Sequence, residues 1–409
     1  MLLNRARANA VLERGGFDGI VALQPIHVLY LTDYSPRMLG ARWDVAYGAV
    51  LARDEAQPTG LVVPAMELLF LDEATLRIHA LECYLAPLPD ASPLDASEPR
   101  AVPFTGFPVS QAGNITANVR AKLEVTRRYG SRAAPDAAHA LGRLVRGAGL
   151  ERARLLTDDP RTPRWLEQAG LKHVTSVYDP AVLKEIRVVK TPDEIERLRA
   201  AARSNESACR GAAACARVGM TAAELERRFA IACIERGNVP TYLVADLGAL
   251  PQGGVHPGEP LMLDALSHRD GYHGDFGRTL VIGDVDAELE RRAAGLDAAW
   301  QAARAAIRPG NDYEAIKSAA AQGAREADFP EFQPPTPHCV GLQHTDDPVP
   351  AGLHPGIKPN RVLEPGMVLN LDMPFVEWGW GTLHREDTVL VTDAGCELLT
   401  SDDETLIRL

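Results

Sequence analysis

The stretch LMLDALSHRDGYHGDFGRT, Leu261–Thr279, decides how the C-terminal half of this chain folds. It begins as an apolar run of the kind that forms a buried strand, and the run leads into an acid, Asp264. A second acid, Asp275, follows eleven residues later. Asp270 and Gly271 between them are typical of a turn, so the stretch favours two adjacent strands. A carboxylate inside a buried strand must be paired or must bind a cation, because desolvating it alone costs too much free energy.

A second pair of acids occurs in the same kind of setting. Asp372 in LNLDMP and Glu386 in HREDTV lie fourteen residues apart, again on two successive strand-like segments. Four converging carboxylates would repel one another strongly unless a cation compensated them. His338, which lies between a proline-rich stretch and a glycine, is the best candidate for an added imidazole. This mixed oxygen and nitrogen set suits manganese, iron, cobalt or zinc.

The order of the elements around these acids repeats. Thr191 and Thr221 each begin a predicted helix with a Thr-x-x-Glu capping box, and strand-like segments follow in PLMLDAL and GRTLVIGD. Two further helices are expected at about 287–307 and 312–327, before the strand-like segments GMVLNLDMPF and EDTVLVTD. The C-terminal part therefore contains two helices followed by strands, twice over. Such halves can pack about a pseudo-two-fold axis with a cleft between them.

The N-terminal part is predicted to be a separate α/β domain. FDGIVAL, YGAVLAR and TGLVVP are strand-like, and two stretches with helical spacing end in glycine. Residues 86–110 are rich in proline, serine and aspartate and are expected to form a surface loop. A chain of 409 residues is too long for one ordinary core. We therefore expect an N-terminal domain at 1–180 and a C-terminal domain at 181–409.

The composition excludes several classes of function. The chain is 46% hydrophobic and 24% charged, as in soluble globular proteins, and its net charge of -12 disfavours nucleic acid or an anionic membrane as a partner. No run of 18 apolar residues occurs, and the first residues lack a signal-peptide core, so a cytoplasmic location is expected. The six cysteines are scattered without CxxC spacing, which favours reduced thiols. No GxSxG, HExxH or P-loop pattern supports another enzyme class.

Several motifs occur together in a specific order. They are the D-x10-D pair with Arg278 and Thr279 behind it, H-x-x-G at His338, LEPGMV at 363–368 and EDTVLVT at 386–392. The order resembles the pita-bread metallopeptidases, the superfamily of creatinase, prolidase, aminopeptidase P and methionine aminopeptidase. The segments LKEIRVVKTPDEIERLRAAA and VLYLTDY are similar to the creatinase-prolidase branch. The resemblance implies an α/β N-terminal domain and an α+β pita-bread catalytic domain.

The resemblance also implies a ligand set and catalytic roles. Two divalent ions are expected, with manganese favoured and cobalt, iron or zinc as alternatives. The implied ligands are Asp264, Asp275, His338, Asp372 and Glu386. Asp275 and Glu386 would bridge the ions, and Asp372 or Glu386 would carry a proton to the leaving nitrogen. His344 would be catalytic or contact the substrate; the alternative is a loop histidine paired with Asp346.

The chain departs from the family pattern around this set. Asp372 stands where a glutamate is usual, and because it is one methylene shorter, a site with one ion is an alternative. The loop before the first ligand strand lacks the usual histidine, and His344 comes one residue early. His384 stands where an arginine is common, and it is expected either to orient Glu386 or to face solvent. His273 and Trp378 are further candidates for lining the cleft.

These observations lead to one functional hypothesis and two alternatives. The leading hypothesis is metal-dependent hydrolysis of a C–N bond in a small peptide, by an Xaa-Pro aminopeptidase or an Xaa-Pro dipeptidase. The changes around the substrate leave open a hydrolase of a small non-peptide amide or amidine, as in creatinase. The second alternative is a metal-free binding module. A homodimer is implied by resemblance to the creatinase-prolidase branch.

Overall fold

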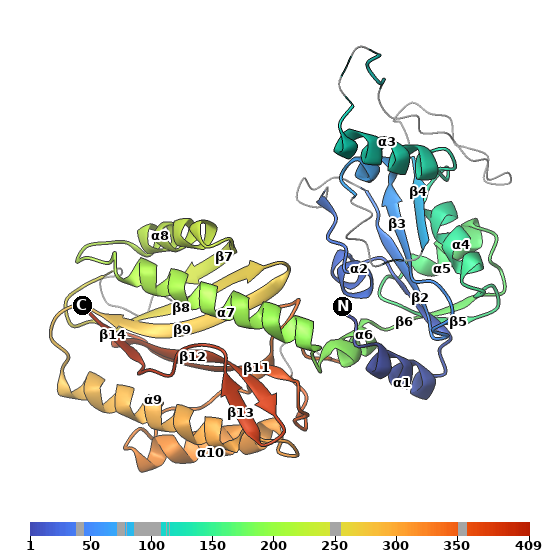
Figure 1. Cartoon of the computed structure of the whole chain (residues 1–409). Coiled ribbons are helices and arrows are strands. Elements are labelled where there is room, and N and C mark those ends of the chain that lie inside the picture. The colour runs from blue at the N-terminus through green and yellow to red at the C-terminus, as the bar shows by residue number, and fades with distance from the viewer. Residues whose placement is uncertain are drawn as a thin grey trace. The chain divides into compact units, whose positions relative to one another are not determined.

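The computed structural model describes residues 1–37, 45–71, 78, 80–85, 108–111, 113, 115–245, 255–350 and 358–409. The chain divides into two compact units, Met1–Arg187 and Val188–Leu409 (Figure 1). The boundary expected at residue 180 falls at the start of the last helix of the first unit. Most of the expected surface loop at 86–110, and most of the loop without a histidine at 245–254, lie outside the described residues.

The first unit is built around a six-stranded mixed sheet with the order β4-β3-β2-β1-β5-β6. Its strands are β1 (Gly19–Ala22), β2 (Gly48–Ala52), β3 (Gly60–Pro64), β4 (Ala80–Tyr84), β5 (Arg154–Thr157) and β6 (Thr175–Tyr178). Its helices are α1 (Arg5–Gly15), α2 (Pro25–Thr32), the short η2 (Ala65–Leu69), α3 (Ala117–Gly130), α4 (Ala137–Gly147), α5 (Thr162–Gln168) and α6 (Pro180–Arg187). Strands β1 to β3 are buried along their whole length, which explains their continuous apolar runs.

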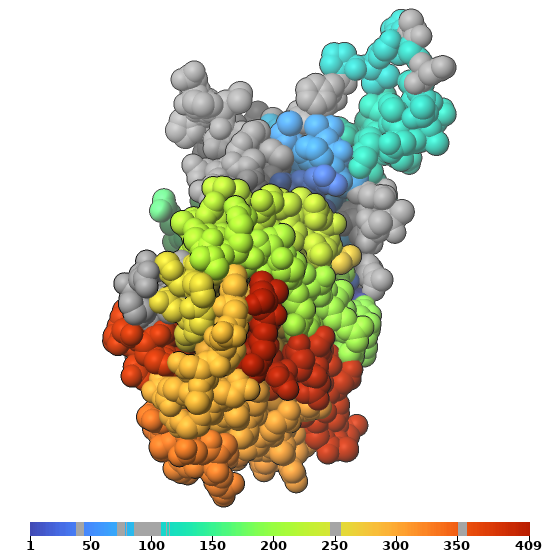
Figure 2. Space-filling view, turned by 90° about the vertical axis from the view of Figure 1, so that its left-hand side faces the viewer, coloured from blue at the N-terminus to red at the C-terminus, as the bar shows by residue number. Residues whose placement is uncertain are grey.

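The second unit contains an eight-stranded sheet whose main path is β10-β11-β12-β9-β8-β7. Its helices are α7 (Pro192–Ala213), α8 (Ala222–Glu235), α9 (Ala287–Ala306) and α10 (Tyr313–Glu326). Its strands are β7 (Val239–Val244), β8 (Leu261–Arg269), β9 (Tyr272–Val281), β10 (His338–Cys339), β11 (Val368–Glu377), β12 (Gly381–Thr392), β13 (Gly395–Leu398) and β14 (Leu406–Arg408). Strand β14 pairs with β9 and is partly exposed, and Figure 2 shows this end of the chain at the surface in dark red.

The chain order confirms the expected duplication. Helices α7 and α8 precede β7 to β9, and helices α9 and α10 precede β10 to β12. The two halves meet where β9 lies beside β12. From this pair outward, β8 corresponds to β11 and β7 corresponds to β10. Figure 1 shows α7 and α8 beside the first half and α9 and α10 beside the second. In the described ranges, every helix is too short or too polar to pass through a lipid bilayer.

Local signals in the sequence set the helix starts. The predicted capping boxes are both present: the hydroxyls of Thr191 and Thr221 accept hydrogen bonds from the backbone of the glutamates three residues on, and those glutamates bond back. Helices α9 and α10 begin behind Asp286 and Asp312, whose carboxylates cap them. The predicted helices at 287–307 and 312–327 are therefore confirmed to within a residue at each end.

The helices cover one face of the second sheet. Gly274 of β9 lets α7 approach closely, because a Cβ atom there would lie 2.3 Å from the carbonyl oxygen of Ala201. On α9, the ring of Trp300 is fully buried and lies 3.9 Å from the guanidinium of Arg385 on β12. Side chains alternate between the faces of a strand, so the residues on either side of Arg385 point to the other face.

Candidate metal centre

Strand register places the predicted carboxylates on one face of the sheet. Asp264 of β8 and Glu386 of β12 are both paired with Gly277 of β9, from its two sides. Directly opposed residues of antiparallel strands share a face, and so do residues two apart on one strand. Asp275 lies two residues before Gly277 and therefore shares this face. Strand β9 therefore contributes the carboxylate of Asp275 to this face, whereas Gly277 leaves its position on the face without a side chain.

The second half adds its ligands to the same face by the same rule. Asp372 of β11 is paired with Glu386, and Asn370 lies two residues before Asp372. His338 of β10 is paired with Asn370. This face is the one opposite Arg385 and the covering helices. All five sequence-predicted ligands are therefore brought together by alternation and pairing alone.

The side-chain distances agree with this register. Candidate ligand atoms lie within 4.8 Å of one another in three overlapping groups: Asp264, Asp275 and Glu386; His338, Asp372 and Glu386; Asp275, His338 and His344. Nε2 of His338 lies 3.9 Å from Oδ2 of Asp275 and 4.0 Å from Oε1 of Glu386. These three side chains are almost completely buried. The groups share members, so they form one continuous cluster.

The cluster contains buried polar atoms without hydrogen bonds. Both carboxylate oxygens of Asp275 and Nε2 of His338 have no hydrogen-bond partner among the described residues. Burying such atoms unsatisfied is costly, and more so when the group is charged. A divalent cation would satisfy all three atoms, and carboxylate oxygen with imidazole nitrogen is a donor set that transition metals accept. The residues present therefore fit a metal centre.

The pKa shifts of the acids show that the cluster carries an excess of negative charge. Burial, and then the charges of Asp275, Asp372 and Asp264, raise the pKa of Glu386 well above its usual range. Burial also raises the pKa of Asp264 to about 6, although His384 opposes the shift. Such acids resist ionising together, because each new charge faces those already present. A bound cation would reverse this effect by favouring the ionised forms.

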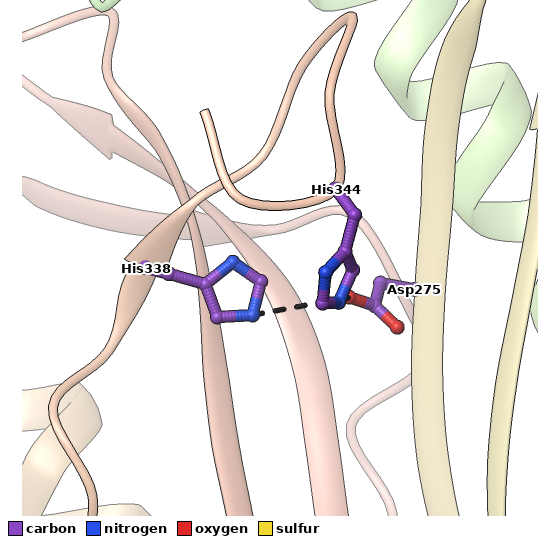
Figure 3. A group of neighbouring side chains, drawn as sticks. All are labelled: Asp275, His338 and His344. Atoms are coloured by element: carbon purple, nitrogen blue, oxygen red, sulfur yellow. Dashed lines mark ion pairs between the residues drawn. The ribbon is translucent and has the colours of Figure 1, made fainter. Parts of the chain in front are cut away.

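His344 lies with the predicted ligands. Its Nε2 is 2.9 Å from Oδ2 of Asp275, and its ring centroid is 4.8 Å from that of His338 (Figure 3). The alternative partner, Asp346, contacts Nζ of Lys190 at 3.5 Å instead. Although burial alone would lower the pKa of His344, the contact with Asp275 raises it. The side chain remains 39% exposed, so His344 forms the open side of the cluster.

His384 is buried inside the site and does not face solvent. Its Nε2 lies 3.0 Å from Oδ1 of Asp372 and 3.6 Å from Oε2 of Glu386. The ring occupies space that Gly277 leaves free, because a Cβ atom at Gly277 would lie 2.3 Å from Cε1 of His384. Burial opposes a charge on this imidazole, but the hydrogen bond and charge of Asp372 raise its pKa.

The structure places the last two candidates, His273 and Trp378, in different surroundings. The backbone N–H of His273 donates to the carbonyl oxygen of Gly341 at 3.0 Å, so His273 ties β9 to the loop between His338 and His344. Trp378 is 76% exposed in the turn between β11 and β12. Six residues of strand separate it from Asp372, or roughly 20 Å. The structure therefore does not bring Trp378 into the cluster.

Two residues that the sequence did not single out also belong to the site. Nδ2 of Asn370 donates to Oε1 of Glu386 at 3.0 Å and so fixes this carboxylate. Tyr242 of β7 is paired with Leu266, which is itself opposite Asp275, so Tyr242 lies on the ligand face. Burial and the charges of the four acids raise the pKa of its hydroxyl. Sequence alone gave no signal for Tyr242, because β7 contains a proline and lacks clear alternation.

Comparisons with known proteins agree with this arrangement. Residues 196–393 match the model of metallopeptidase family M24. A protein of Mycobacterium tuberculosis named "Probable dipeptidase PepE" is 29% identical over 273 residues, which are 63% of this chain and 71% of that protein. The residues that match the family model, 196–393, contain every predicted ligand.

Solved structures match the whole chain. A dipeptidase from Pyrococcus horikoshii OT3 has a TM-score of 0.70 at 18% identity, with 99% of each chain covered. An X-Pro aminopeptidase from Thermotoga maritima MSB8 has a TM-score of 0.65 at 16% identity, again with 99% of each chain covered. These likenesses confirm the predicted fold, an α/β N-terminal domain followed by a pita-bread domain.

Proposed function

We propose that this protein is a member of metallopeptidase family M24, whose model matches residues 196–393, and that it is a metal-dependent hydrolase of short peptides that cleaves the bond before proline. The names of its relatives, a dipeptidase and an X-Pro aminopeptidase, support a peptide substrate. The observation that carries the proposal is the buried cluster, in which two halves of the fold supply acids and imidazoles to one point.

The proposed ligands are those that the two halves bring together. They are Asp264, Asp275, His338, Asp372 and Glu386. We propose two divalent ions, with manganese favoured by the carboxylate-rich set and cobalt, iron or zinc as alternatives. When bound, such ions lower the pKa of water and stabilise the negative charge that develops on a carbonyl oxygen under attack.

The protein's own side chains would handle the proton. Glu386 is fixed by Asn370 and fully buried, so it can accept a proton from the attacking water without exchanging it with solvent. Asp372 is paired with Glu386 across the two strands, and its side chain is 31% exposed, so it could pass the proton to a leaving nitrogen. The contact between Nε2 of His384 and Oδ1 of Asp372, at 3.0 Å, holds this carboxylate in place. The exposure of His344 makes it accessible to a substrate.

Location and assembly are also part of the proposal. All six cysteines are free thiols, which supports a reducing compartment such as the cytoplasm. The net charge of -12 supports a protein without nucleic-acid or anionic-membrane partners. The homodimer rests on the resemblance to the creatinase-prolidase branch, and light scattering behind size-exclusion chromatography would test it.

A peptide-release assay tests the function. Purified protein is loaded with manganese or cobalt, its metal content is measured, and it is incubated with Xaa-Pro dipeptides, longer peptides that begin Xaa-Pro, and matched Xaa-Ala peptides. We expect release of the first residue from the proline series, faster than from the alanine series. Metal-loaded protein that cleaves none of these peptides would refute the peptidase. Turnover of creatine or another small amide alone would favour the non-peptide alternative.

A further inference from the structure

We propose that His344 is a sixth metal ligand, so that one ion is held by two imidazoles, His338 and His344, together with Asp275. The proposal rests on the proposed function, because it assumes that the cluster binds metal. It goes beyond the five ligands that the resemblance implies, because His344 is not among them. It also changes the role of His344, because an imidazole bound to metal is not free to act as a general base.

The separations among the three side chains support a shared ion. Nε2 of His344 lies 2.9 Å from Oδ2 of Asp275, and Nε2 of His338 lies 3.9 Å from the same oxygen. All three candidate atoms lie within 4.8 Å of one another. Atoms bound to one ion at about 2.1 Å lie about 3 to 4 Å apart, depending on the angle at the metal. The two distances to Oδ2 of Asp275, 2.9 and 3.9 Å, are close to this range.

His344 and Asp275 approach one another as an ion pair. Neither oxygen of Asp275 has a hydrogen-bond partner among the described residues, although Nε2 of His344 is near enough to be one. Both atoms are of the kind that a transition metal accepts, so one cation placed beside them could be bound by both.

The loop that carries His344 is fixed at several points. The backbone N–H of Gly341 donates to Gln343, and the N–H of Asp346 donates to Cys339, so the chain folds back directly after His338. The buried pair of Asp346 and Lys190 anchors the far end of the turn. A Cβ atom at Gly341 would lie 2.3 Å from Oδ2 of Asp346, so the turn is tightly packed. His344 is thus held beside His338 by the backbone.

A second imidazole has a consequence for metal choice. Imidazole nitrogen suits iron, zinc and the later first-row metals, whereas sets of carboxylate and water suit manganese and magnesium. Two imidazoles on one ion would therefore move the preference of that position from manganese toward cobalt, iron or zinc. Removing His344 should move it back.

Proton NMR of the cobalt-loaded protein tests the proposal, because each bound imidazole gives a strongly shifted N–H signal that disappears in D2O. We expect two such signals from the wild type and one from His344→Gln. His268→Gln, which removes a histidine from the neighbouring hairpin tip, should keep both. Chelator competition should show that His344→Gln weakens cobalt binding at least about tenfold and manganese binding less.

One shifted signal from the wild type, or cobalt affinity that His344→Gln leaves unchanged, would overturn the proposal. Neither measurement uses a substrate, so the result is separate from that of the peptide assay. A protein that shows two signals but cleaves no peptide keeps the second imidazole and loses the proposed function. A peptidase with one signal keeps the function and loses the sixth ligand.

Discussion

Nε2 of His384 lies 3.0 Å from Oδ1 of Asp372, so two residues that each depart from the family pattern are in contact. The family usually has the longer glutamate and arginine at these positions. Here both side chains are shorter. The imidazole of His384 occupies the space that Gly277 leaves free, and from there it reaches the carboxylate of Asp372. Burial opposes ionisation of Asp372, but the hydrogen bond and charge of His384 lower its pKa. The two departures are therefore best understood as one compensated change.

If the two positions compensate one another, their substitutions should not be additive. Asp372→Glu alone should lower kcat/KM, because the longer carboxylate must displace His384. Adding His384→Arg to Asp372→Glu should restore part of the loss, with a coupling energy of roughly 1 kcal/mol or more. A double-mutant cycle in kcat/KM and in metal affinity measures this coupling. Losses that simply add would show that the two positions are independent.

Gly277→Ala should impair the site and the fold together. The new methyl group would lie 2.3 Å from a buried imidazole that cannot leave without losing Asp372. We expect a loss of about 1 to 3 kcal/mol in the free energy of unfolding, with weaker metal binding. Gly147→Ala is the matched control, because a Cβ atom at Gly147 meets nothing within 4 Å and helix α4 should gain slightly. Equal stability of both variants would contradict the close packing at Gly277.

Asp275→Ala should abolish metal-dependent activity, with a fall of at least about a hundredfold, because it removes a ligand with two unsatisfied oxygens. In the wild type, saturating metal should raise the free energy of unfolding by roughly 3 kcal/mol at a hundred times Kd, and a chelator should reverse this gain. Asp270→Asn changes a turn residue with positive φ that asparagine tolerates, so it is the control. Near-normal turnover by Asp275→Ala would remove this residue from the ligand set.

Glu194 should make the metal-free protein less stable as the pH rises. Burial raises its pKa to about 7, although Lys190 opposes the shift. Between the unfolded pKa, near 4.5, and 7, the folded state binds more protons than the unfolded state, so stability falls with increasing pH. Relative to Glu194→Gln, the wild type should lose on the order of 3 kcal/mol over this window. Denaturant unfolding at a series of pH values measures it, and a constant difference between the two proteins would exclude the effect.

Lys190→Met should destabilise the second unit by roughly 3 kcal/mol or more, because it leaves the buried carboxylate of Asp346 without its ion pair. It should also weaken cobalt binding, since this pair anchors the loop that carries His344. Lys317→Met breaks a surface pair with Glu314 on helix α10 and should cost less than about 1 kcal/mol. Unchanged metal affinity in Lys190→Met would mean that the pair supports the fold but not the ligand loop.

Much of this arrangement can be read from the sequence, because local patterns determine it. Apolar runs that end at Asp264 and Asp372, and one that follows Glu386, identify the strands that carry these acids. Thr-x-x-Glu capping boxes mark where helices α7 and α8 begin. The repeat in element order then indicates two equivalent halves, and the equivalent position of the acids predicts that they converge.

Other parts depend on contacts between distant segments and leave no local pattern. Lys190 meets Asp346 across 156 positions of sequence, and Tyr242 reaches the acids only through the register of β7 against β8. The contact of His344 with Asp275 depends on how sharply the chain folds back after His338. By spacing, His344 lies one residue before the position of the family histidine. The turn after His338 determines that its partner is Asp275 and not Asp346.

The seam between β9 and β12 implies an order of events during synthesis. Asp264 and Asp275 are made long before Glu386, and the register that joins them forms only when β12 docks beside β9. A nascent chain that ends before β12 therefore presents half of a binding site, too weak to capture an ion firmly. Tight metal binding should therefore begin only when the domain is complete. A truncated product should bind no metal and should be more susceptible to proteolysis.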